Sequence, residues 1–195
     1  MDYISKEEII NWLKEHLDEE RFEHSIGVAE TAVKLAEKFN QNKEKAYIAG
    51  LLHDCAKCMK KEDLLDVINT HLVVEDCEKI NPKTFHAPVG AYVARWDFDV
   101  YDDEILSAIR WHTIGKLEMS DFEKIIFIAD KIEPKTRPVE YINKIKPKLD
   151  LPNGLDMALL ECYKGTIKSL VDRNLKICTS TIDIYNELLN KYEQN

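Results

Sequence analysis

The sequence predicts an all-α protein, and two observations support this, while a third shows that the protein is globular. Only six glycines and six prolines occur among 195 residues, which weighs against a turn-rich all-β fold. Nearly every segment between turn signals repeats its apolar residues at helical period. Hydrophobic residues make up 45% of the chain and charged residues 32%, which is ordinary for a globular protein and excludes wholesale disorder. The length indicates one domain over residues 1–195.

The first part of the chain is expected to form six helices. Ser5 and Glu8 form a capping box that opens the first, which extends to about Leu17. Pro88 suits the first position of a helix, and Gly115 suits the position just after one. The next five helices are expected at about 21–39, 43–54, 61–71, 88–96 and 102–113.

The second part of the chain is expected to contain three more helices. Ser120 and Glu123 form another capping box before the apolar run that ends at Asp130. Four of the six prolines fall in 134–152, which predicts loops there. Helices at about 154–174 and 180–192 close the chain, although 177–184 also alternates like a strand.

Charge and hydropathy exclude several classes of protein. A net charge of −9 and a pI near 5.2 disfavour binding to nucleic acid or to anionic membranes. The longest apolar stretch, 46–52, is too short for a membrane span, and the N-terminal residues form no secretory signal. Five scattered cysteines indicate reduced thiols. We therefore expect a cytoplasmic protein with a small-molecule partner.

Cys55 and Cys58 stand at Cys-x-x-Cys spacing, which is also found in zinc and redox sites. A structural zinc site would need a second such pair, and a thioredoxin-like site would need a βαβ unit. Neither is expected in this chain. Two small residues on a helical turn are the better interpretation.

Six polar side chains lie at places that favour metal binding. Asp130 follows Ile126 and Phe127 on an apolar helix face, where an ionised carboxylate needs a cation or a metal. Asp54 is also an acidic residue at the end of an apolar helix and needs a cation or a metal for the same reason. Imidazole and carboxylate together are suitable ligands for a divalent transition metal. Because one metal takes about four protein ligands or fewer, six candidates suffice for two ions. These candidates are His24, His53, Asp54, His86, His112 and Asp130.

A single histidine at a helix end is usually solvated or caps the helix, and we interpret His16 and His71 in this way. The order of the six candidates is more specific than any one of them. It resembles the HD superfamily of metal-dependent phosphohydrolases, whose ligands occur as His, His-Asp, Asp. The two additional histidines match the subset with a dinuclear centre.

Five motifs bring the resemblance closer, to the bacterial YqeK family of symmetrical bis(5′-nucleosyl)-tetraphosphatases. They are Arg21-x-x-His24-Ser25-x-Gly27-Val28, Leu51-Leu52-His53-Asp54-x-x-Lys57, His86-Ala87-x-x-Gly90, Trp111-His112-Thr113-x-Gly115 and Ala129-Asp130-x-x-Glu133-Pro134-x-x-Arg137. The resemblance implies an all-α HD-domain helical bundle around a dinuclear metal site. It implies a metal-site core at about 18–135 and C-terminal helices at about 154–192 that pack on it.

The resemblance also implies a reaction. Diadenosine tetraphosphate would be cleaved symmetrically to two ADP by a metal-bound hydroxide that attacks an inner phosphate. Two divalent ions would be present, with Asp54 bridging them. The family implies iron, while the ligand types also admit manganese, cobalt, nickel or zinc.

Four further residues are candidates for contact with the substrate. Lys57 lies three residues after Asp54, and Arg137 lies in a proline-bounded loop, so both could bind phosphate in a catalytic role. Arg21 and Thr113 are weaker candidates. Glu133 could orient a metal ligand or face water.

Other functions are open from the sequence. Another HD phosphohydrolase could use the same ligands on nucleoside mono- or triphosphates or on alarmones. A helical adaptor with a vestigial metal site is a different class, and a homodimer is compatible with any of them. The nucleoside-contacting residues and the base preference are open too.

Overall fold

The computed structural model describes residues 5–193, and these contain α-helices, two short 3₁₀ helices and no strand. The all-α prediction is confirmed. The α-helices are α1 (Lys6–His16), α2 (Glu19–Lys38), α3 (Lys43–Leu52), α4 (Lys61–His71), α5 (Asp76–Lys79), α6 (His86–Asp97), α7 (Asp103–Trp111), α8 (Asp121–Ile132), α9 (Val139–Ile145), α10 (Gly154–Asp172) and α11 (Thr179–Glu193). The 3₁₀ helices are η1 (Pro82–Thr84) and η2 (Lys146–Asp150).

Both predicted capping boxes are present, at the starts of α1 and α8. The start of α6 differs from the prediction. It begins at His86 because Phe85 is already helical, so Pro88 occupies the third position of the helix instead of the first. Proline is tolerated there because the N–H groups of a first helical turn have no partner within the helix.

The proline-rich region 134–152 contains loops, as predicted, but also two short helices that were not. Pro138 is the N-cap of α9, and Pro147 lies in the first turn of η2, so each proline sits where a helix begins. The short helix α5 was not predicted either. The strand alternative at 177–184 is wrong, since α11 begins at Thr179.

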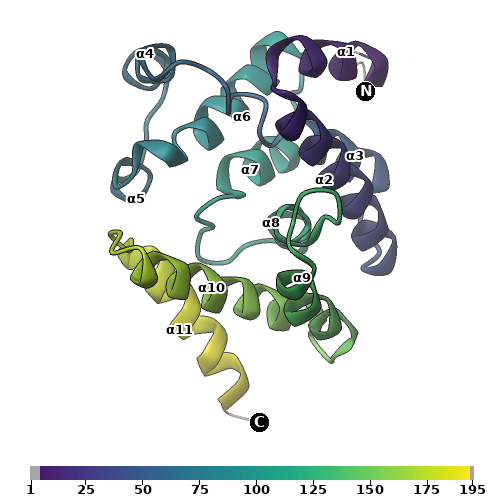
Figure 1. Cartoon of the computed structure of the whole chain (residues 1–195), viewed down its shortest axis with the longest axis vertical. Helices are drawn as coiled ribbons and strands as arrows, with labels where there is room; N and C mark the ends of the chain where they lie inside the picture. The colour runs from purple at the N-terminus through teal and green to yellow at the C-terminus, as the bar shows by residue number, and fades with distance from the viewer. Residues whose placement is uncertain (1–4, 194–195) are drawn as a thin grey trace.

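Helix α8 is the central helix of the fold, with nine of its twelve residues buried. It contacts α2, α3, α7, α9 and α10, and Figure 1 shows it between the N-terminal helices and α10. Helices α2 and α3 pack closely at Gly50, where a Cβ atom would lie 2.6 Å from Cα of Ala29. Helices α3 and α7 both pack on α8, and this packing holds their C-terminal ends near it.

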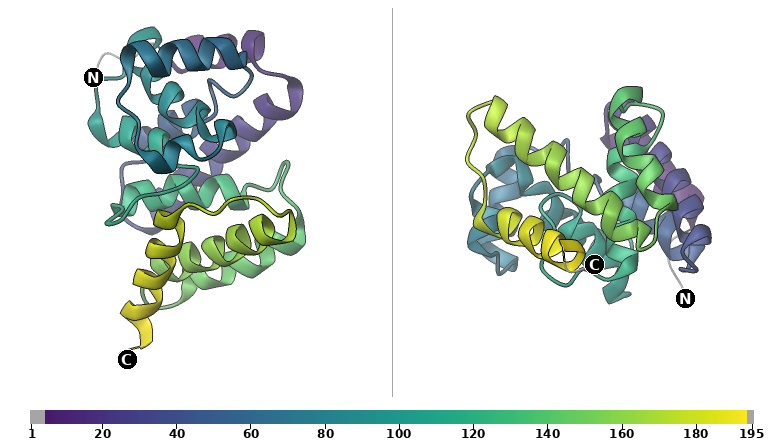
Figure 2. Two further views of the ribbon diagram at one scale, coloured as in Figure 1. Left: turned by 90° about the vertical axis from the view of Figure 1, so that its left-hand side faces the viewer. Right: turned by 90° about the horizontal axis from the view of Figure 1, so that it is seen from below.

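The C-terminal helices share the same core. Buried residues from Ile9 in α1 to Leu188 in α11 belong to one hydrophobic cluster. In Figure 2, α10 lies across one end of the other helices and α11 projects beyond them. Within the described chain, no helix has both the length and the apolar character that a bilayer crossing needs.

Candidate metal centre

The six candidate metal ligands come from five different parts of the fold and are all buried. His24 lies in α2, His53 caps the end of α3 and Asp54 follows it. His86 opens α6, His112 caps the end of α7 and Asp130 lies in α8. Their exposed fractions do not exceed 4%. Residues separated by more than a hundred positions therefore meet inside the protein.

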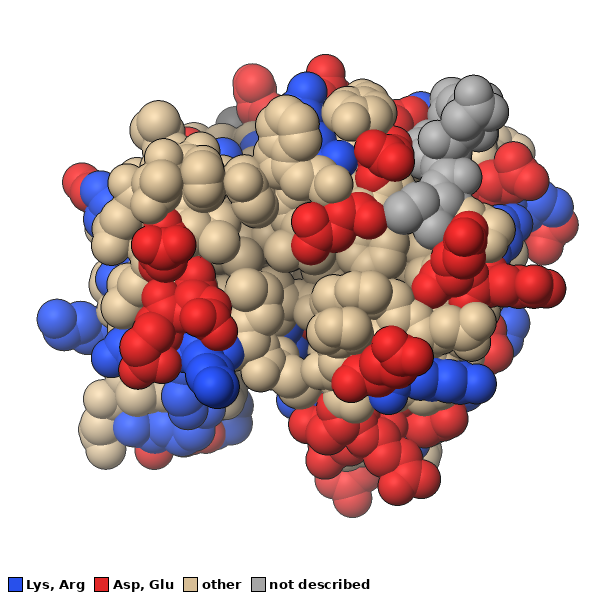
Figure 3. Space-filling model, turned by 90° about the horizontal axis from the view of Figure 1, so that it is seen from above, with Lys and Arg blue, Asp and Glu red and all other residues tan. Residues whose placement is uncertain are grey.

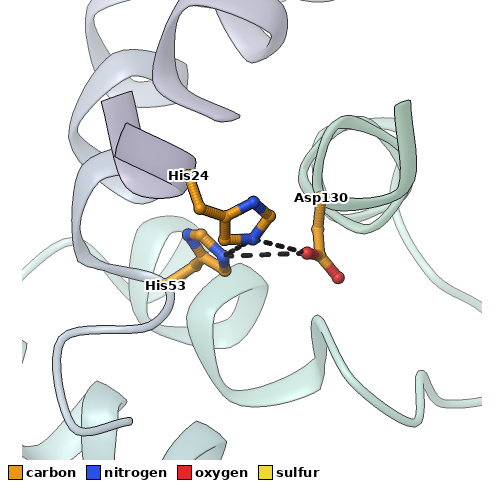
Figure 4. Close-up of side chains that lie close together, drawn as sticks. All are labelled: His24, His53 and Asp130. Atoms are coloured by element: carbon orange, nitrogen blue, oxygen red, sulfur yellow. Dashed lines mark hydrogen bonds and ion pairs between the residues drawn. The ribbon is translucent and has the colours of Figure 1, made fainter. Parts of the chain in front are cut away.

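Two overlapping groups of three ligands have the proximity that a metal ion requires. We call His24, His53 and Asp130 the Asp130 group, and His53, Asp54 and His112 the His112 group; in each, the ligand atoms lie within 4.8 Å of one another. Figure 4 shows the three side chains of the Asp130 group pointing toward one another. His86 joins the His112 group, because its Nε2 atom is 3.0 Å from Oδ1 of Asp54.

Three of the histidines are oriented by the same backbone device. The Nδ1 atom of each lies against the carbonyl oxygen three residues earlier, at 2.7 Å for His53, 2.8 Å for His86 and 2.7 Å for His112. A carbonyl oxygen only accepts, so Nδ1 carries the proton and donates it. In the neutral ring, Nε2 then presents a lone pair toward the other candidate ligands.

His24 is oriented by a side chain instead. Its Nδ1 atom donates to Oε1 of Glu133 at 3.0 Å, and Glu133 is completely buried. The Glu133 carboxylate accepts further hydrogen bonds from the backbone N–H groups of Lys135 and Thr136. Nε2 of His24 faces Oδ1 of Asp130 at 2.9 Å. Sequence reasoning left the role of Glu133 open, and the structure places it behind a candidate ligand.

The acceptor atoms of these residues are arranged as they would be around a cation, and their burial would be costly without one. Nε2 of His53 is 3.3 Å from Nε2 of His24, so two lone pairs face each other when both rings are neutral. Oδ1 of Asp54 is buried and accepts no hydrogen bond from the described residues. Unpaired buried acceptors are costly, and a divalent ion with nitrogen and oxygen ligands would remove that cost.

The charge states agree with this. Burial lowers the pKa of His53 to about 3, and burial also lowers the pKa of His86, so both rings are neutral near pH 7. Burial alone would raise the pKa of Asp130, but the positive charges of Lys131 and Arg137 outweigh it and hold that pKa well below its ordinary value. Neutral imidazole beside ionised carboxylate is the form in which these residues bind metals.

Four basic residues surround the carboxylates, and three of them are candidates for phosphate contact from the sequence. The guanidinium of Arg21 lies 3.2 Å from Oδ2 of Asp54, and the ammonium of Lys57 lies 3.8 Å from Oδ1. Lys57 also lies 3.1 Å from Nε2 of His86, and burial lowers its pKa. Arg137 donates to the carbonyl oxygen of Asp130 at 2.7 Å and to its carboxylate. Lys131, which sequence reasoning missed, pairs with the same carboxylate.

The remaining sequence predictions concern side chains near the cluster. The hydroxyl oxygen of Thr113, next to His112, is buried and has no hydrogen-bond partner among the described residues. His16 stacks on Trp12, and His71 stacks on Tyr92; neither belongs to the two groups.

Cys55 and Cys58 belong to neither ligand group. Cys55 is buried with its sulfur atom 3.6 Å from the carbonyl oxygen of Gly90, while Cys58 is exposed. They lie on turns after α3 and not within the helix.

Comparison with known proteins identifies the family of the chain, and that family is consistent with a cluster of histidine and aspartate residues. A family model described as HD domain matches residues 21–135. The chain is 36% identical over 186 residues to a symmetrical bis(5′-nucleosyl)-tetraphosphatase of Bacillus subtilis, which covers 95% of this chain and 98% of that protein. The chain belongs to this family of HD-domain hydrolases. A second member, from Halalkalibacterium halodurans, is 37% identical over 188 residues, with 95% of this chain and 98% of that protein covered.

A solved structure supports the HD assignment across the whole fold. The crystal structure of an HD superfamily hydrolase from Clostridium acetobutylicum, described as involved in NAD metabolism, matches with a TM-score of 0.89 and 36% identity. The match covers 97% of this chain and 100% of that one, so it includes the C-terminal helices as well as the residues matched by the HD model.

Proposed function

We propose that this HD-domain hydrolase cleaves diadenosine tetraphosphate symmetrically into two molecules of ADP. The observation that carries the proposal is the convergence of four imidazoles and two carboxylates in a buried cluster. The names of relatives that match nearly the full chain supply the substrate class. The chain would act as one domain, with the C-terminal helices sharing its core.

The proposed centre holds two divalent metal ions. The Asp130 group would hold one ion, and Asp54, His86 and His112 would hold the other, with Asp54 between them. Asp54 suits this position because a carboxylate offers two oxygens, here Oδ2 at 3.7 Å from Nε2 of His53 and Oδ1 at 3.4 Å from Nε2 of His112. When bound, two such ions supply Lewis acidity toward phosphate oxygens and toward an attacking water.

The basic residues of the chain would position the tetraphosphate. Lys57 and Arg21 lie over Asp54 and would contact phosphate oxygens at the centre, where negative charge develops in phosphoryl transfer. Arg137 would share its guanidinium between Asp130 and a phosphate. Thr113 has an unpartnered hydroxyl that could donate to a phosphate oxygen.

The balance of the reaction is simple. The oxygen of a water molecule forms a bond to one inner phosphorus, and the bond from that phosphorus to the central bridging oxygen breaks. One ADP leaves through the bridging oxygen, the other keeps the oxygen from water, and the two protons of that water end on the products or solvent. The chain forms no covalent intermediate in this scheme.

Iron is the metal we propose, on the strength of the family resemblance and of mixed nitrogen and oxygen ligands. We also propose a cytoplasmic enzyme with a small nucleotide as substrate and a homodimer as its assembly. The net charge of −9 disfavours nucleic acid and anionic membranes as partners. Metal analysis of protein purified under reducing conditions tests the first of these statements, and light scattering tests the assembly.

Product analysis tests the function. Protein prepared with ferrous iron under reducing conditions is given diadenosine tetraphosphate, and the nucleotides are separated by chromatography. ADP as the only product supports the proposal. ATP with AMP would contradict the symmetrical cleavage, and absence of turnover by metal-loaded protein would favour another HD substrate or the adaptor.

A further inference from the structure

A basic groove opens beside Asp130, and apart from Arg137 none of its lining residues has been given a role in the reaction described above. It has a volume of about 710 Å³ and lies between the α8–α9 region and α10. Its lining residues are Lys131, Arg137, Tyr141, Lys144, Gly165, Thr166, Lys168, Ser169, Asp172 and Arg173. We call it the α9–α10 groove. Cavities of this size are large enough for a nucleotide.

The groove is directly connected to the metal centre. Lys131 and Arg137 line it, and both pair with the carboxylate of Asp130, the candidate ligand contributed by α8. A molecule in the groove would therefore meet two cations at the end nearest the metal centre. The negative charge of a phosphate would be compatible with that end.

The charge of the groove contrasts with the charge of the chain. Five of its ten lining residues are lysine or arginine and one is acidic, although the chain as a whole carries a net charge of −9. Lys168 is paired with that acidic residue, Asp172, at 2.9 Å, and Lys131 and Arg137 are paired with Asp130. Lys144 and Arg173 have no ion pair among the described contacts, so the lining keeps an excess of positive charge. On the face drawn in Figure 3, acidic side chains form several patches among the other residues. Local positive charge in an acidic protein favours a polyanionic ligand at that place.

The wall of the groove also offers an aromatic ring. Tyr141 of α9 lies against Gly165 of α10, where a Cβ atom would come within 2.8 Å of Cε2 of the ring. The absence of a side chain at Gly165 thus lets the ring pack on the α10 backbone and face the groove. A flat ring beside cations suits the nucleoside of a nucleotide, with its phosphates toward Asp130.

A second groove, of about 620 Å³, lies between α4, α6 and α7. Tyr92, Trp96 and Trp111 line it with only two arginines. One of these, Arg110, is paired with Glu78 at 2.7 Å. No side chain that lines this groove pairs with a candidate metal ligand among the described contacts, so it carries the weaker case for phosphates.

We infer that the α9–α10 groove binds a nucleoside diphosphate, which is one half of the dinucleotide before cleavage and a product after it. This inference rests on the proposed function for the identity of the dinucleotide, but not for the binding of ADP. Lys144 and Lys168 attract the phosphates, and Tyr141 contacts the nucleoside. Adenosine, which has no phosphate, binds much more weakly than ADP.

The test removes two cations from the groove. We compare the double variant Lys144→Ala/Lys168→Ala with wild type, using calorimetry with ADP, AMP and adenosine at several salt concentrations, and steady-state kinetics with diadenosine tetraphosphate. The expected result is a rise of about fivefold to tenfold in both the ADP dissociation constant and KM, with kcat unchanged. The dependence of ADP affinity on salt falls as well. A merely structural role would not change that slope.

The matched control removes the same charge elsewhere. Lys34→Ala/Lys146→Ala changes a separate hollow that is also lined by Lys38 and Leu149, and it should leave ADP binding and KM as in wild type. Gly165→Ala is a second test variant, in which the new methyl group displaces the ring of Tyr141. It should lower the affinity for ADP without changing the dependence of that affinity on salt.

The outcomes separate this inference from the proposed function. If the Lys144→Ala/Lys168→Ala variant turns over the dinucleotide with unchanged KM and unchanged ADP affinity, the groove is not the binding site for ADP. The proposed function would then stand. Lysine-dependent binding of ADP without turnover of the dinucleotide supports the groove and contradicts the function. Equal affinity for adenosine and ADP would also overturn the groove as a phosphate site.

Discussion

The Asp130 group and the His112 group share His53, but different partners hold them in place. In the Asp130 group, His24 is held by the Glu133 carboxylate, and Asp130 is paired with Lys131 and Arg137. In the His112 group, His53 and His112 are each held by a backbone carbonyl of the helix that they terminate. One half of the site thus depends on side chains at the end of α8 and in the loop after it, and the other depends on backbone carbonyl groups at the ends of α3 and α7.

This difference has a physical consequence. The last carbonyl groups of a helix have no partner within the helix, so a histidine at the C-cap can satisfy one of them and be oriented by it. Only loss of the helix end would release His53 or His112. The loop residues Glu133 and Arg137 can instead be altered by single substitutions. We therefore expect the Asp130 group to be the half that mutations outside the ligands can weaken selectively.

The largest effect is expected where both halves meet, at Asp54. Its carboxylate oxygens lie 4.0 Å from Nε2 of His24 and 3.0 Å from Nε2 of His86. Asp54→Ala should therefore remove both ions of the proposed centre and lower kcat by at least about a thousandfold. Elemental analysis and turnover measure the two effects together. Retention of either metal or of wild-type turnover would falsify the shared site, and circular dichroism checks that the variant is folded.

The next largest effect is expected from Glu133→Gln. The substitution keeps the size of the side chain but removes the negative charge that accepts the Nδ1 proton of His24. Loss of such a partner behind a metal-binding histidine costs about 10- to 100-fold in metal affinity or activity. Titration with a chelator should release one ion early while the other is kept. Simultaneous loss of both ions would contradict the expectation that Glu133 supports the Asp130 group selectively.

A pair of glycine substitutions offers a smaller and more selective test. At Gly27, a Cβ atom would lie 2.5 Å from Oε2 of Glu133, so Gly27→Ala must displace the carboxylate that holds His24. At Gly90, a Cβ atom would lie 3.5 Å from the carbonyl oxygen of His53, which is an ordinary contact. We expect Gly27→Ala to lower the affinity for one metal ion by about tenfold. Gly90→Ala should leave the affinity for both ions unchanged. The same loss in both variants would mean that the effect is general destabilisation.

Much of this architecture could be predicted from the sequence. The apolar period along α8 predicts that Asp130 is buried, and the adjacent pair His53-Asp54 at the end of an apolar helix predicts a buried carboxylate. The helices with strong periodicity or a capping box were found. The short helices α5 and α9 were not, because four and seven residues provide too little periodicity to detect.

What the sequence could not predict depends on contacts between distant elements. Glu133 lies one turn after Asp130, a position that can equally face solvent, and only the close approach of Gly27 in α2 makes it a buried partner of His24. Arg137 was expected to bind phosphate, and the structure shows it paired with Asp130. Lys144 and Lys168 lie on two different helices, and their common groove exists only because α9 packs on α10.

The smallest effect concerns the helix that ends at His112. Asp102 begins α7: its Oδ1 atom accepts from the N–H of Glu104 at 3.0 Å, and its Oδ2 atom pairs with Lys45 of α3 at 2.8 Å. Asp102→Ala should therefore lower the free energy of unfolding by about 1 kcal/mol at pH 7. Because the histidines of the His112 group are held by backbone carbonyl oxygens, metal content should not change. Asp103→Ala, next to it and exposed, is the charge-matched control.

The loss of stability in Asp102→Ala should depend on pH, in a direction that follows from the pKa of Asp102. Burial alone would raise the pKa of Asp102, but Lys45 and the N–H groups of α7 outweigh it and lower the pKa below its ordinary value. A carboxylate with a lowered pKa stabilises the fold above the pKa of the unfolded chain, about 4. This stabilisation is lost as the pH falls through the lower pKa of the folded state. Urea unfolding should thus show the difference between wild type and Asp102→Ala shrinking below about pH 4. A constant difference from pH 7 to pH 3 would show that the carboxylate charge does not contribute, and loss of metal in this variant would mean that the His112 group is not fixed by its helix ends alone.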